Sequence, residues 1–148
     1  MDTIENFKLL LNEINAEMEQ NFELDENNGF SFLCLDTLVN VTVLPESGYV
    51  MLGTQLGTLG DDENAPKRAR WFLEQNDGLL GSNGFTYSMD ESNQSIWLSD
   101  RRTLDEIENA DAFAAWVDTL VQTAHQAWNV TEYEYPYVDD AEDEEDAE

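Results

Sequence analysis

The fold is decided by residues 30–56, which read FSFLCLDTLVNVTVLPESGYVMLGTQL. Residues 30–35 are rich in strand-forming side chains, and residues 38–44 alternate apolar with polar side chains. The Pro-Glu-Ser-Gly sequence at 45–48 is a turn signal, and residues 49–56 alternate again with a period of two. Because the connections between these segments are short, the stretch predicts three strands in an antiparallel meander.

The segment before the meander has a helical period. Apolar residues recur every three to four positions over residues 3–20, and Asp2 or Thr3 can cap the start of the helix. The spacing predicts an amphipathic helix that needs an apolar surface to cover. Its apolar stripe consists of Ile4, Phe7, Leu11, Ile14 and Met18, thickened by Leu10.

Two more helices are expected after the meander. Pro66 suits the first turn of a helix that runs to Asn76, and Gly78 ends it. Thr103 and Glu106 have the spacing of a capping box. The helical period that follows extends to about residue 129.

A second pair of strands separates these two helices. Residues 85–89 and 95–99 have strand composition and flank a polar loop at 90–93. The predicted order is therefore helix–three strands–helix–two strands–helix. This order indicates an α+β fold with an antiparallel sheet packed by helices.

The chain is strongly acidic. It has 33 acidic residues against six Lys and Arg, and eight of the acids lie in residues 139–148. Such a charge repels nucleic acid and anionic membranes, so we expect neither as a partner. A single cysteine and the lack of a long apolar run indicate a cytoplasmic protein. The acidity itself is explained equally well by solubility or by basic partners.

No residue pattern indicates catalysis, a metal site or a cofactor. His125 is the only histidine and lies inside the last predicted helix, which is too little for a triad or a histidine-based metal site. Cys34 lies between two leucines in a strand, and we interpret it as a small buried apolar residue. Lys67, Arg68 and Arg70 are expected to pair with acids such as Glu63 or Glu74.

Aromatic residues are the strongest indication of protein binding. Four tryptophans are many for 148 residues, and surplus aromatics often mark interfaces. Trp71 and Phe72 are adjacent on a short helix, so both cannot face the same core. One of them is expected to face a partner, and a second copy of the chain is the simplest candidate.

Several local sequences, in this order, resemble class I type III secretion chaperones, the family that includes the Tir and Yop-effector chaperones. The resemblance covers residues 4 to 128. It is carried by Leu56-Gly57-Thr58-Leu59 at the exit of the third strand, Leu73 with Asn76, Asn83-Gly84-Phe85, the run Ile96 to Leu104 with its paired arginines, and the helix end Ala124 to Trp128.

The resemblance implies a homodimer without a cofactor that binds a secreted effector protein. Such a chaperone holds the N-terminal chaperone-binding segment of the effector in extended form and keeps it competent for type III secretion. The segment would bind by filling apolar pockets and by pairing with a sheet edge. The bacterial secretion-apparatus ATPase is a further partner that the resemblance suggests.

The resemblance also suggests where these contacts lie on this chain. We expect the effector-binding groove to include Phe7, Phe30, Phe32, Leu35 and Val41. We expect the dimer interface to include Trp71, Phe85, Tyr87 and Trp97. For each of these residues the alternative is an ordinary place in the core.

The sequence also predicts where the folded domain ends. Residues 1–136 are expected to form the chaperone-like domain, and residues 137–148 an acidic, mobile tail. The alternative to a secretion chaperone is a protein of the same fold, or an acidic decoy, that binds another, basic protein outside secretion.

Overall fold

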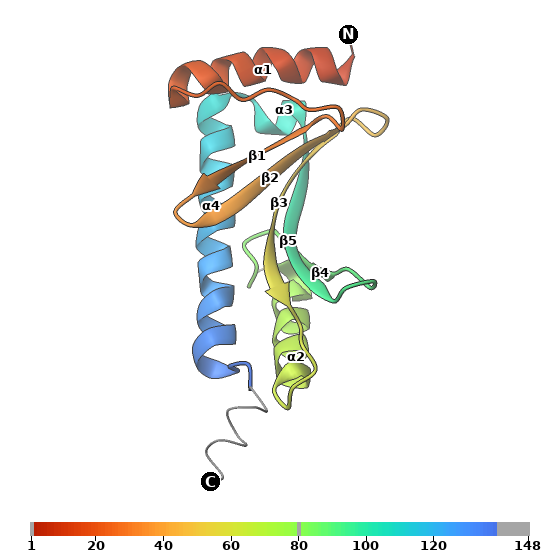
Figure 1. Ribbon diagram of the computed structural model, residues 1–148. Helices are drawn as coiled ribbons and strands as arrows, with labels where there is room; N and C mark the ends of the chain where they lie inside the picture. Colours follow the sequence, from red (N-terminus) through yellow and green to blue (C-terminus); the bar gives the residue numbers. More distant parts are fainter. Residues whose placement is uncertain (1, 80, 139–148) are drawn as a thin grey trace.

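The computed structural model describes residues 2–79 and 81–138 and combines one sheet with helices (Figure 1). It confirms the α+β fold and the order predicted from the sequence. The elements are α1 (Thr3–Met18), β1 (Gly29–Cys34), β2 (Thr37–Leu44), β3 (Tyr49–Thr58), α2 (Ala65–Asn76), β4 (Thr86–Met89), β5 (Ser95–Thr103), the short α3 (Leu104–Ile107) and α4 (Ala110–Asn129). A 3-10 turn (Asp77–Leu79) follows α2, and a π-helical turn (Val130–Glu134) follows α4.

The sheet is antiparallel, with the strand order β1-β2-β3-β5-β4. The predicted meander is β1 to β3, and β5 joins it along β3. β5 extends to Thr103, beyond the expected end at residue 99, because its second half pairs with Tyr49–Leu52 of β3. β1 and β4 lie at the two edges, and Gly57, with a φ of 116°, accommodates a register shift in β3.

One face of the sheet is covered by helices. Val39, Val41 and Val43 of β2 are buried there, whereas Leu38 on the other face is half exposed. α1 crosses the sheet near one end and buries Phe7, and the long α4 runs down beside the sheet (Figure 1). The predicted apolar stripe of α1 therefore packs against the buried face of the meander, which carries the three valines of β2.

The helix ends follow the sequence signals. The Asp2 carboxylate accepts a hydrogen bond from the backbone N–H of Ile4, and Thr103 with Glu106 forms the predicted capping box. That box begins the short helix α3. α4 then starts separately behind its own cap, Asn109.

The segment after α4 packs back onto the body of the protein. The Tyr137 hydroxyl donates to the Thr58 carbonyl, and the backbone N–H of Val138 donates to Asp62 at 3.0 Å. The expected boundary between residues 136 and 137 thus lies within a contact region. The remainder of the predicted tail, residues 139–148, lies outside the described residues.

This segment encloses Arg68, whose side chain is fully buried. Arg68 forms an ion pair with Asp62, not with the expected Glu63, while Arg70 pairs with Glu74 as expected. The guanidinium also donates to the carbonyls of Leu59, Tyr135 and Pro136, and it lies 3.9 Å from the centre of the Tyr137 ring.

In the part of the chain that the structure describes, no helix is long and apolar enough to cross a membrane.

Candidate functional site

A groove opens along β1, between the end of α1 and α4. Its volume is about 410 Å³. The groove is lined by Met18, Gln20, Phe22, Phe32, Leu33, Cys34, Ala114, Val117 and Asp118. We call it the β1 groove.

The floor of the β1 groove rests on stacked aromatic rings. Phe22 lies 5.0 Å from both Phe30 and Phe32, measured between ring centres. Phe22 belongs to the loop after α1, and the Asn15 side chain fixes its backbone by one accepted and one donated hydrogen bond, of 2.9 and 3.0 Å. The loop is therefore held in place by a side chain of α1, and its aromatic ring is held against β1.

The edge of the sheet beside the groove is apolar. Among the described residues, β1 pairs only with β2. Leu33, Leu35 and Leu38 around the β1–β2 turn are 73%, 71% and 50% exposed. A free strand edge next to exposed apolar side chains is a surface on which another extended chain can pair.

The turn between β1 and β2 is tied to α4. Leu35 and Asp36 both have positive φ, 48° and 69°, in the left-handed region where non-glycine residues are uncommon. Nε2 of His125 lies 3.2 Å from the Leu35 carbonyl oxygen and 3.5 Å from the Thr37 hydroxyl. His125 therefore holds this turn against the helix.

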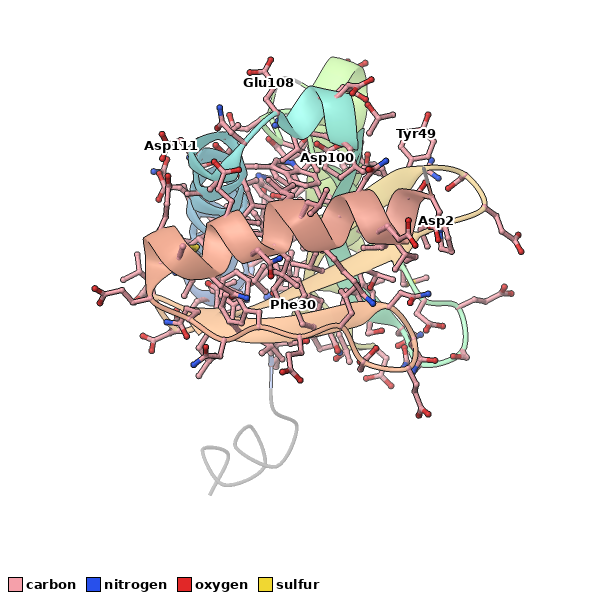
Figure 2. All side chains as sticks on the ribbon, turned by 90° about the horizontal axis from the view of Figure 1, so that it is seen from above. Asp2, Phe30, Tyr49, Asp100, Glu108 and Asp111 are labelled. Carbon is pink, nitrogen blue, oxygen red and sulfur yellow. The ribbon has the colours of Figure 1, made fainter. Side chains whose placement is uncertain are left out.

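The residues expected to form the groove are divided by the structure. Phe32 lines the β1 groove, Phe30 stacks against it, and Leu35 projects at its end. Phe7 and Val41 are buried in the core and present no surface to a ligand. Figure 2 shows Phe30 beneath α1.

Cys34 is not buried as expected. It is half-buried and lines the groove, because its strand lies at the edge of the sheet.

The sequence analysis did not identify three further residues that line the groove, Phe22, Ala114 and Val117. Phe22 lies in a loop without periodicity, and the two α4 residues belong to a helix whose packing direction only the tertiary structure defines.

Carboxyl groups gather at one rim of the groove. Glu17 of α1 and Asp111 of α4 approach each other, and a hydrogen bond to Asp111, together with its charge, raises the pKa of Glu17. Asp111 projects from the start of α4, on the side of the C-terminal half of α1 (Figure 2). Neighbouring carboxylates repel, so this rim favours a proton or a cation between them.

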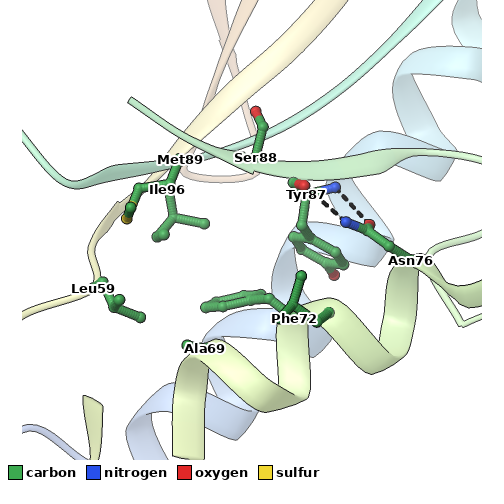
Figure 3. Close-up of a pocket in the computed structure, with 9 residues that line it drawn as sticks. Leu59, Ala69, Phe72, Asn76, Tyr87, Ser88, Met89 and Ile96 are labelled. Carbon is green, nitrogen blue, oxygen red and sulfur yellow. Dashed lines mark hydrogen bonds between the residues drawn. The ribbon is translucent and has the colours of Figure 1, made fainter. Parts of the chain in front are cut away.

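A second apolar hollow lies between α2 and β4 (Figure 3). Its volume is about 230 Å³. It is lined by Leu59, Ala69, Phe72, Leu73, Asn76, Tyr87, Ser88, Met89 and Ile96. We call it the α2–β4 hollow. Leu73 and Met89 at this hollow are 71% and 49% exposed.

Only part of the expected dimer interface lies at this hollow. Trp71 is half-buried, and its ring centre lies 5.2 Å from Phe72 and 5.7 Å from Tyr87. Phe85 and Tyr87 are buried within the chain. Trp97 lies on the opposite face of β5 from Ile96, which lines the hollow. Leu73 and Met89, which the sequence analysis did not select, are the exposed apolar residues here.

Two side chains define the chemistry of the hollow. Asn76 donates to the Tyr87 carbonyl and accepts from the Tyr87 backbone N–H, both at 2.8 Å, and so ties α2 to the edge strand β4 (Figure 3). The buried Tyr87 hydroxyl has no hydrogen-bond partner among the described residues, and burial raises its pKa.

In the described part of the chain, no group of three or more potential ligands is arranged to hold a metal ion.

A family model, that of the Tir chaperone protein (CesT) family, matches residues 9–128. The chain belongs to this family. The match begins within α1, ends at residue 128 of α4, and includes both the β1 groove and the α2–β4 hollow. The family is one of chaperones, which agrees with the lack of a catalytic pattern in the sequence. A search of curated proteins finds no match.

Solved structures share the fold of this family member at low sequence identity. A chain of the ExsC–ExsE complex has a TM-score of 0.67 at 17% identity, covering 86% of this chain and 94% of that one. A chain of the HopA1–SchA chaperone–effector complex gives 0.68 at 12%, covering 81% and 91%. The Yersinia pestis type III secretion chaperone SycH, solved with a fragment of YscM2, gives 0.62 at 16%, covering 80% and 97%.

Proposed function

We propose that this protein binds the N-terminal chaperone-binding segment of a secreted effector in extended form. It keeps the segment soluble and competent for type III secretion, in the bacterial cytoplasm and without catalysis. The observation that carries the proposal is the β1 groove, an aromatic-floored channel beside a free strand edge. Membership in the Tir chaperone family and the structures of chaperone complexes support it.

The geometry suits an extended ligand better than a folded one. A strand that pairs with β1 would direct every second side chain toward the groove, because side chains alternate along a strand. Its backbone would form hydrogen bonds with the unpaired N–H and C=O groups at the edge of β1. It would also cover Leu33 and Leu35 from solvent. In this proposal Phe32 contacts the bound segment from the groove, Phe30 supports Phe32 from behind, and the exposed Leu35 contacts the segment beyond the groove.

We also propose that the protein is a homodimer through the α2–β4 hollow. Leu73 and Met89 are exposed apolar side chains beside a concave apolar surface, and Trp71 extends it. A second copy of the same surface would cover them in a two-fold arrangement. We assign no surface to the expected contact with the secretion-apparatus ATPase.

An acidic decoy for a basic protein is the second candidate function, favoured by the net charge of −27. Such binding would depend on exposed charges and would weaken strongly at about 0.5 M salt, where the Debye length is only about 4 Å. Binding that fills the apolar groove would persist at this salt. Salt dependence of a purified complex therefore separates the two candidates.

The single cysteine allows a direct test of the groove. A benzophenone–maleimide attached to Cys34 would lie inside it, and the probes are N-terminal segments of secreted proteins encoded beside this chain. We expect light-induced cross-links to one segment of a true effector. In the control variant C34S/L9C the label moves to position 9 on α1, where Leu9 is 61% exposed and lies outside both apolar surfaces, and it should not capture that segment. Cross-links from both positions alike, or from neither, would contradict the proposal.

A further inference from the structure

The walls of the β1 groove come from parts of the chain that contain no basic residue. No Lys or Arg lies between Lys8 and Lys67, and none follows Arg102. The groove is built from residues 18–34 and 114–118, so neither wall carries a cation of its own.

The carboxyl groups of Glu17, Asp111 and Asp118 lie along the rim of this groove. Asp111, Ala114 and Asp118 recur at three- and four-residue spacing on α4, are exposed, and therefore share one helix face. Ala114 and Asp118 line the groove directly. Glu17 reaches Asp111 from α1 and precedes Met18, which lines the opposite wall.

We propose that the β1 groove selects an extended segment whose apolar side chains are flanked by Lys or Arg. The apolar side chains enter the groove, and the cationic groups meet Glu17, Asp111 and Asp118. This inference rests on the proposed function and adds the chemistry of the bound segment. A cation between Glu17 and Asp111 would relieve their mutual repulsion, and an acidic segment would increase it.

Three labelled peptides test the preference. They share the core Leu-Ser-Val-Ser-Leu and carry Lys-Lys, Gln-Gln or Glu-Glu at both ends, and their binding is followed by fluorescence anisotropy. We expect the Lys peptide to bind roughly tenfold more tightly than the Gln peptide at about 50 mM salt, and the Glu peptide more weakly still. At about 500 mM salt the difference should fall below about twofold.

Two variants of equal net charge distinguish the effect of the rim carboxylates from the effect of the protein's overall negative charge. E17Q/D111N/D118N removes the three rim carboxylates. E46Q/E91Q/E132Q removes three exposed carboxylates from the β2–β3 turn, the β4–β5 turn and the π-helical turn. The rim variant should lose the preference for the Lys peptide, and the control variant should keep most of it. Circular dichroism verifies that both variants fold.

The possible failures are distinct. Equal loss in both variants would mean that overall charge attracts the peptide, and it would overturn the inference. Equal binding of the Gln and Lys peptides to the unmodified protein would also overturn it, while leaving the groove as a binding site. If none of the three peptides binds, both the inference and the proposed groove are wrong.

Discussion

The side chain of Arg68 is a fully buried cation. It donates hydrogen bonds to residues 135 and 136, which explains why the segment after α4 packs back onto the protein. Its guanidinium is shared between Asp62 and backbone carbonyls of two distant segments, before α2 and after α4. A buried cation is tolerated only when its donors are satisfied in this way. Residues 135–138 are therefore part of the fold around α2.

Replacing Arg68 by Met should destabilise the protein by roughly 3–5 kcal/mol, because the substitution leaves Asp62 and several carbonyls without their donor. The control is R70M on the same helix. Arg70 forms only an exposed pair with Glu74, at 3.0 Å, so we expect less than about 0.5 kcal/mol there. Urea unfolding measures both. Equal effects of the two substitutions would show that the buried network contributes little.

Asp62 gives this network a pH dependence. The hydrogen bond from Arg68 is the largest cause that lowers the Asp62 pKa, from 3.8 to about 2. A lowered pKa stabilises the folded state above the unfolded pKa, and this contribution is lost as the pH falls from about 4 to about 2. We expect D62N to unfold more easily at neutral pH and to lose less stability over that acidic window. Urea midpoints from pH 7 to pH 2 test this, and parallel curves for the two proteins would contradict it.

At the scale of elements, sequence periodicity predicted most of the fold. The strands in residues 30–56 and the helix α1 each bury one side, so the spacing of their apolar residues is enough to predict the type of each element. Residues 130–138 have no such period, because they are held by hydrogen bonds to Arg68 and Asp62 and not by the burial of one regular face. The β1 groove was only partly predicted for a similar reason, since Phe22 is placed by Asn15 and Val117 by the packing of α4.

The contact between α2 and β4 provides a test at this scale. Asn76 satisfies both backbone groups of Tyr87, so N76A should cost about 2 kcal/mol, for two hydrogen bonds of about 1 kcal/mol each. N76D keeps the acceptor for the Tyr87 N–H but places a carboxylate oxygen opposite the Tyr87 carbonyl oxygen, so it should cost at least as much stability as N76A. Hydrogen exchange of the Tyr87 amide should be accelerated most in N76A. Unchanged protection at Tyr87 would mean that β4 is held mainly by β5.

At the scale of the whole molecule, the two apolar surfaces are separate. The β1 groove lies at one edge of the sheet and the α2–β4 hollow at the other, because β1 and β4 are its two edge strands. A dimer formed through the hollow would therefore leave both grooves open, one on each subunit. Its net charge of −27 per chain opposes association at low salt, so the apolar contact must be strong enough to overcome this repulsion.

The solution mass decides whether the hollow forms the dimer. Light scattering coupled to size exclusion at moderate salt should give twice 16.9 kDa for the unmodified protein and 16.9 kDa for L73D. Leu73 is 71% exposed in the single chain, so an aspartate there should disturb the interface and not the fold. The matched control is L9D, because Leu9 is 61% exposed on α1, away from the hollow, and this variant should remain dimeric. A monomeric unmodified protein at micromolar concentration would contradict the dimer but not the groove, whereas a dimer that L73D leaves intact would place the interface elsewhere.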